Sequence, residues 1–107
     1  MDAIDLVREH FASLGTKKIE VPEWKLTIHA SPVTLAEKGR LYKKSRESDM
    51  ELLVDILLMK ATSEDGKKLF TIEDKAVLLN RADSNVVARV ANAILSDDAP
   101  KAEDLKN

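Results

Sequence analysis

Cysteine is missing from this chain, and glycine and aromatic residues are scarce. Without cysteine there is no disulfide, no thiolate ligand for a metal and no cysteine nucleophile. The three glycines, Gly15, Gly39 and Gly66, lie far apart, so no glycine-rich loop can hold a phosphate group. No apolar run approaches the ~18 residues that indicate a membrane-spanning helix. These absences exclude several classes of site, and we expect no membrane partner.

Charge of either sign is not in excess. Lysine and arginine total 17 against 19 aspartates and glutamates, which gives a net charge of -2. This balance provides no global positive field for nucleic acid. The 44% hydrophobic content and the 107-residue length fit one globular domain, which we expect over residues 1–96. Residues 97–107 are polar and without periodicity, so we predict a disordered tail there.

Catalytic groups are equally scarce. His10 and His29 are the only histidines, and neither has an acidic or serine partner of the kind that a general base needs. A calcium loop centred on Gly66 fails, because its first and twelfth positions would be Ala61 and Ile72. No nucleophile motif is present. We therefore predict that the protein is not an enzyme and that it holds no cofactor and no metal.

The amino-terminal part of the chain changes period after Gly15. Before it, apolar residues recur at spacings of three and four: Ile4, Val7, Phe11 and Leu14. This spacing predicts an amphipathic helix over residues 2–14. Alternation over residues 18–21 and 24–29 then predicts two short strands. Because proline disfavours the tightest hairpin turns, we expect Pro22–Glu23 to form a looser type I connection.

The rest of the chain has helical periodicity. Residue pairs and single residues that suit helix starts recur along it: Thr34 with Glu37, Thr71 with Asp74, and Ser84. With apolar spacing, they predict helices over residues 34–45, 49–61, 71–80 and 84–95. The predicted fold class is α+β, mostly α. A short two-stranded β element is preceded by one helix and followed by a bundle of about four helices.

The helix predicted over residues 49–61 is apolar around most of its circumference. One stripe contains Met50, Leu53, Val54, Leu57, Leu58 and Ala61, and a second contains Leu52, Ile56 and Met59. Such a helix is either the centre of the core or has a partner on its second face. We hypothesise that the second stripe binds a partner protein, and the alternative is that both stripes are internal. The residues assigned to partner binding are Leu52, Ile56, Met59, Trp24 and Phe70.

Two motifs carry a family resemblance. Val21-Pro22-Glu23-Trp24 ends the first strand, and Leu69–Asp74 opens a late helix that leads to the segment Asn85–Leu95. In the order of these elements the chain resembles the tail assembly chaperones of long-tailed bacteriophages and prophages. The resemblance spans roughly Lys17 to Ser96. The chain departs from the family pattern at Lys25, where family members often have glycine, and at Ser31-Pro32-Val33.

The resemblance implies a role in assembling a viral tail. Such a chaperone works in the host cell cytoplasm, binds the tape measure protein, keeps it soluble and helps to recruit the tail tube protein. It is absent from the finished virion, and the family often makes a longer product by ribosomal frameshifting. Self-association is a second expectation, because many weak contacts along a rod gain from multivalency. The acidic residues Asp2 and Asp5 agree with a cytoplasmic location, since a signal peptide would begin with basic residues.

A small DNA-binding phage or plasmid regulator is the alternative function. Residues 38–46 form the most basic stretch, and the helices predicted over 71–80 and 84–95 follow each other as in a helix-turn-helix. The second of these would read the bases, yet Arg89 is its only basic residue. Since base readout needs polar side chains at the start of that helix, the sequence favours a protein partner over nucleic acid.

Overall fold

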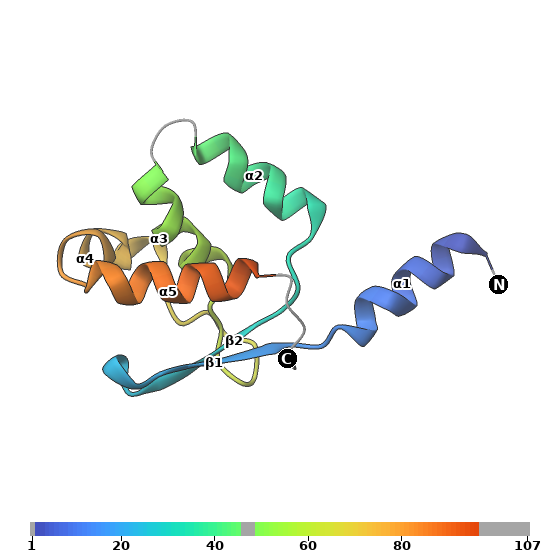
Figure 1. Ribbon diagram of the computed structural model, residues 1–107, viewed down its shortest axis with the longest axis horizontal. Coiled ribbons are helices and arrows are strands. Elements are labelled where there is room, and N and C mark those ends of the chain that lie inside the picture. The colour runs from blue at the N-terminus through green and yellow to red at the C-terminus, as the bar shows by residue number, and fades with distance from the viewer. Residues whose placement is uncertain (1, 46–48, 97–107) are drawn as a thin grey trace, which may run out of the picture.

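The change of period after Gly15 separates a helix from a hairpin, and helices follow to the end of the described chain. A computed structural model describes residues 2–45 and 49–96. Its helices and strands are α1 (Ala3–Ser13), β1 (Lys17–Val21), β2 (Leu26–Ala30), α2 (Leu35–Ser45), α3 (Asp49–Lys60), α4 (Lys75–Asn80) and α5 (Ser84–Leu95) (Figure 1). The predicted α+β class, mostly α, is confirmed. The tail predicted over residues 97–107 lies outside the described residues.

The two strands pair as an antiparallel hairpin. Ile19 lies opposite Ile28, and Val21 lies opposite Leu26. The connection is a single 3₁₀ turn, Pro22–Trp24, so Trp24 lies in the turn and not in the second strand as we had expected. Lys25 follows with a φ of 54°. Glycine adopts this left-handed conformation without the steric cost that a residue with a Cβ atom bears.

A third segment, which no local pattern of residues predicts, extends the hairpin. The His29 N–H donates to the Thr62 carbonyl at 2.8 Å, and the Thr62 N–H donates back to the His29 carbonyl at 3.0 Å. A second isolated bridge joins Thr62 to Lys68. The chain that leaves α3 therefore pairs with the edge of β2 before it turns at Gly66 and runs toward α4.

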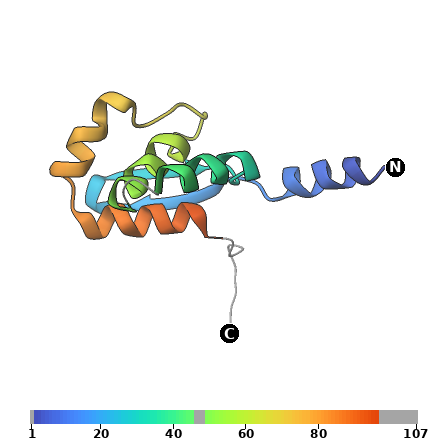
Figure 2. The same cartoon turned by 90° about the horizontal axis from the view of Figure 1, so that it is seen from above.

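The helices pack around α3. This helix contacts α2, α4 and α5, and α5 also lies against β1. Figure 2 shows α5 along one side of the molecule in the view from above, where α2 and α3 overlap. The core consists of apolar residues from the hairpin, α2, α3, α4 and α5: Val21, Ile28, Ala30, Leu41, Val54, Ile56, Leu57, Ala61, Leu78, Val86, Val87, Val90, Ala91 and Ile94. Met50, which belongs to the first apolar stripe that we predicted for α3, is exposed and lies outside this core.

Polar contacts hold the helix ends. Both predicted capping boxes form, at Thr34–Glu37 and at Thr71–Asp74. The last helix is capped differently from our prediction, because Asp83 and not Ser84 is the residue that accepts a hydrogen bond, from the Asn85 N–H at 2.8 Å. The sequence Asp83-Ser84 offers two good capping residues in a row, and local spacing does not distinguish them.

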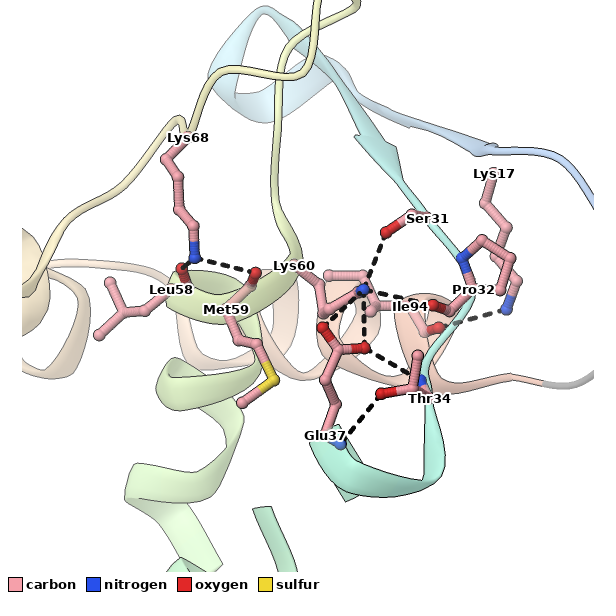
Figure 3. Close-up of polar contacts among 10 residues, drawn as sticks. All are labelled: Lys17, Ser31, Pro32, Thr34, Glu37, Leu58, Met59, Lys60, Lys68 and Ile94. Atoms are coloured by element: carbon pink, nitrogen blue, oxygen red, sulfur yellow. Dashed lines mark hydrogen bonds and ion pairs between the residues drawn. The ribbon is translucent and has the colours of Figure 1, made fainter. Parts of the chain in front are cut away.

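Two lysines fasten distant elements together (Figure 3). Lys60, which is 5% exposed, donates to Ser31 at 2.8 Å and to Glu37 at 3.0 Å, and so joins α3 to the start of α2. Burial works against ionisation of Glu37, but hydrogen bonds from Thr34 and Lys60 outweigh it and lower the pKa of the carboxyl. Lys17 donates to the Ala93 carbonyl at 3.0 Å and so satisfies a carbonyl at the end of α5.

α1 differs from the other helices because no residue in it is buried. It projects away from the rest of the protein in both views (Figures 1 and 2). It ends as predicted at Gly15, which has a φ of 68° and thus the left-handed conformation that often terminates helices. The apolar residues that predicted this helix remain exposed to solvent: Ile4, Val7, Phe11 and Leu14.

Candidate functional site

A groove lies between α2, α3 and the segment 68–72. Its cavity volume is about 440 Å³, within the range of binding pockets in proteins. We call it the α2–α3 groove, and its lining residues are Arg40, Leu41, Asp55, Leu58, Met59, Lys68, Phe70, Thr71 and Ile72. Most of its apolar surface therefore comes from the last turns of α3 and from the chain that precedes α4.

The wall formed by residues 68–72 is held at both of its ends. Lys68 donates to the carbonyls of Leu58 and Met59, both at 3.1 Å, in the last turn of α3 (Figure 3). These carbonyls have no partner within the helix, so the ammonium group both satisfies and screens them. At the other end, the Thr71 N–H donates to Asp74 at 2.9 Å in the capping box. The groove is thus formed before any ligand arrives.

The charge at the rim of the groove is positive. Arg40 and Lys68 are exposed beside the apolar lining. The one carboxylate of the lining, Asp55, is buried and forms an ion pair with Lys75 at 3.1 Å. Hydrogen bonds to Asp55 and then to Glu51 raise the pKa of Lys75, so this lysine stays charged. The groove therefore suits an apolar ligand that carries net negative charge.

The residues assigned to partner binding divide into three groups. Met59 and Phe70 line the groove. Trp24 lies behind it, because its ring packs against Phe70 with centroids 6.0 Å apart at 80°. Leu52 is half-buried and outside the lining, and Ile56 is 1% exposed. Ile56 thus belongs to the core, and for this residue the internal alternative replaces the partner-binding assignment.

Seven of the nine lining residues were not among those that we assigned to partner binding from the sequence, and Arg40, Leu58 and Ile72 are three of them. Leu58 was placed on the first stripe of α3, Arg40 was seen only as part of the basic stretch 38–46, and Ile72 was seen only as part of the short helix predicted over residues 71–80. Ile72 is 71% exposed. The position of Ile72 directly after the capping residue Thr71 could have predicted this exposure. The first residue of a helix has no preceding turn on which to pack.

The described residues hold no group of three or more histidines, aspartates or glutamates that could bind a metal ion. In residues 2–45 and 49–96 no helix is long and apolar enough to cross a membrane. Glu51 and Asp55 lie one turn apart on α3, and both bind Lys75, at 3.2 and 3.1 Å. Their geometry is that of a structural ion pair and not of an acid–base couple.

The helix-turn-helix alternative meets a specific obstacle at Arg89. Its guanidinium donates two hydrogen bonds to the Glu23 carboxylate, at 2.7 and 2.8 Å. These bonds lower the pKa of Glu23 to about 2, so the carboxylate stays charged at neutral pH. The only basic side chain of α5 is therefore already neutralised by the turn between β1 and β2.

Comparison with known proteins gives no independent guide to function. The chain matches no model of a protein family, no curated protein and no solved structure.

Proposed function

We propose that this protein is a binding module that seats an amphipathic helix of a client protein in the α2–α3 groove. The observation that carries the proposal is the juxtaposition of Leu58, Met59, Phe70 and Ile72 with a cationic rim. A preformed apolar groove flanked by charge is the usual receptor for a helix with one apolar face. Methionine adapts its shape to different side chains, which suits a groove that must accept successive segments of a long client.

The client in this proposal is the tape measure protein of a long-tailed phage. Its identity rests on the family resemblance of Val21–Trp24 and Leu69–Asp74. Both motifs contribute to the structure around the groove. Trp24 packs on Phe70, which lines the groove, and the capping box Thr71–Asp74 holds the wall formed by residues 68–72. By covering apolar stripes of the client helix, the protein would keep it soluble in the host cytoplasm until tail tube subunits replace it.

The DNA-binding alternative has weaker support. Phosphate contacts need free cations on one face. The cation of α5, Arg89, is paired with Glu23. We therefore rank a protein client first.

Co-expression with the tape measure protein encoded by the same phage genome tests this function. We expect the full chain to keep the client soluble and to co-purify with it. Ile72→Glu should lower the affinity for the client at least about tenfold, which corresponds to about 1.4 kcal/mol. The change places a charge in the apolar lining but leaves the core intact, because Ile72 is largely exposed.

Val77→Glu is the matched control, because Val77 is also exposed but lies outside the groove. Equal capture of the client by the wild type, Ile72→Glu and Val77→Glu would contradict the groove as the binding site. Failure of the wild type to bind the client, together with salt-dependent retention of duplex DNA, would favour the regulator instead. Ile56→Glu is unsuitable for this test because it would disrupt the core.

A further inference from the structure

α1 presents an uncovered apolar stripe. Ile4, Val7, Phe11 and Leu14 follow each other at spacings of three, four and three residues, and they are 41–61% exposed. This spacing gives the narrow seam that one helix presents to a groove or to another helix. α1 has 11 residues, fewer than the ~12–15 that even good helix formers need in water. The helix therefore needs a surface to pack on.

The groove of the same chain is out of reach for most of this stripe. Three residues, Leu14–Thr16, join α1 to β1, and they span at most about 10 Å. β1 is fixed in turn, because Lys17 donates to carbonyls at the end of α5. In both views α1 projects from the end of the molecule opposite α4, which follows the groove wall 68–72 (Figures 1 and 2). Phe11 and Leu14 are thus held near Lys17, away from the groove.

The net charges of α1 and of the groove are complementary. α1 with its preceding residue carries the carboxylates Asp2, Asp5 and Glu9 against one arginine, Arg8. Arg8 is paired within the helix, with 3.6 Å between its guanidinium and the Asp5 carboxylate. The groove has the opposite sign at its rim, as described above. Attraction between a net-negative helix and a positive rim steers the two together.

We propose that α1 of one copy lies in the α2–α3 groove of a second copy, and that α1 of the second copy lies in the groove of the first. The inference rests on the groove binding helices, as proposed above, but not on the identity of the client. A single contact by a helix about 16 Å long is small, whereas two reciprocal contacts approach the roughly 1,200–2,000 Å² of a stable interface. Twofold symmetry is also the commonest arrangement of identical subunits.

The dimer has a consequence for client binding. The helix of the second copy occupies the surface that the client would use, so α1 protects the apolar groove until the client displaces it. In this arrangement α1 also gains the packing surface that its own chain does not provide. Disrupting α1 should then release monomers whose grooves are open.

Sedimentation velocity of the full chain over a range of concentrations tests the dimer. We expect the wild type to be dimeric and Phe11→Glu to raise the dimer dissociation constant about 100-fold, because a symmetric dimer loses the same contact twice. Leu6→Glu is the matched control. Leu6 is exposed on the same helix but lies about 80° around it from Leu14 and about 100–160° from the other three stripe residues, so this variant should remain dimeric.

The receiving surface is tested separately by Arg40→Glu, an exposed change on α2 that leaves the core intact. We expect it to weaken the dimer, and equimolar mixing with Phe11→Glu should restore some dimer through one intact helix and one intact groove. Dimers unaffected by Arg40→Glu and by Ile72→Glu would overturn the inference, since they would indicate pairing of α1 with α1. A wild type that is monomeric at all concentrations would overturn it too, even if the client were still captured.

Discussion

α1 and α5 are two amphipathic helices with opposite outcomes. They have 11 and 12 residues, and each carries a regular apolar stripe. In α5 five apolar residues are buried: Val86, Val87, Val90, Ala91 and Ile94. In α1 none is buried. Both apolar stripes need a surface on which to pack. Only the stripe of α5 packs on such a surface within its own chain.

The difference comes from the surfaces that surround each helix. α5 lies against α3 and β1, it is capped by Asp83 at its start, and Lys17 binds its last carbonyls. α1 is separated from the strands and the other helices by Gly15, and it projects away from them. Amphipathicity therefore predicts that a face requires a partner, but not that the partner belongs to the same molecule.

The largest expected contrast comes from shortening the same residue type in each stripe. Ile94→Ala should lower the free energy of unfolding by about 2–5 kcal/mol, because it leaves a cavity in the core. Ile4→Ala should change it by no more than about 0.5 kcal/mol in the monomer, because Ile4 is exposed. Urea unfolding at a concentration below dimer formation measures both. Equal losses would show that α1 packs on its own domain.

A second contrast compares a buried ion pair of the body with an exposed one in α1. Lys60→Met should lower the free energy of unfolding by about 1–3 kcal/mol, since it removes the donor to Glu37 and Ser31 in a buried site. Arg8→Met should cost less than about 1 kcal/mol, because its pair with Asp5 is largely exposed. Adding Glu37→Gln to Lys60→Met should recover part of the loss. Additive losses in this double variant would mean that Lys60 and Glu37 are not coupled.

A third contrast concerns the residues that precede the two helices. Asp83→Ala should lower the free energy of unfolding by about 1 kcal/mol, because Asp83 accepts a hydrogen bond from the Asn85 N–H in the first turn of α5. Asp2→Ala should cost less than about 0.5 kcal/mol, since the Asp2 side chain makes no capping hydrogen bond. Thermal unfolding of the two variants provides the measurement. Asp83→Asn, which keeps an acceptor, should remain close to the wild type, and a loss equal to that of Asp83→Ala would refute this role for the oxygen.

Most of the fold could be predicted because its signals are local. Helix spacing, the two capping boxes and the alternation around Ile19 and Ile28 each depend on residues a few positions apart. The bridge from His29 to Thr62 could not be predicted, because it joins positions far apart in the chain through backbone groups that every residue has. The placement of α1 outside the core was hidden for a related reason, since periodicity carries no information on distance from the other helices.

The groove could be predicted only in part. We assigned Met59 and Phe70 to partner binding from the sequence, Met59 because it belongs to the second apolar stripe of α3. Both residues line the groove. Ile56 was misassigned because a helix surrounded by α2, α4 and α5 buries more of its circumference than one stripe. The cationic rim could not be seen at all, because Arg40 and Lys68 come together only when α2 and the chain after α3 fold over the same helix.

The smallest expected effect on stability concerns the ion pair of Arg89 in α5 with Glu23 in the hairpin turn, which has no counterpart among the ion pairs of α1. Because the bond to Arg89 lowers the pKa of Glu23 from 4.5 to about 2, its stabilising contribution is complete above pH 4.5 and is lost as the pH falls toward 2. The contribution should be slight, since both side chains are exposed to solvent. Titration of the Glu23 carboxyl by NMR should give a midpoint near pH 2. Arg89→Met should return this midpoint toward 4.5, and an unchanged midpoint would show that Arg89 does not hold the turn against α5.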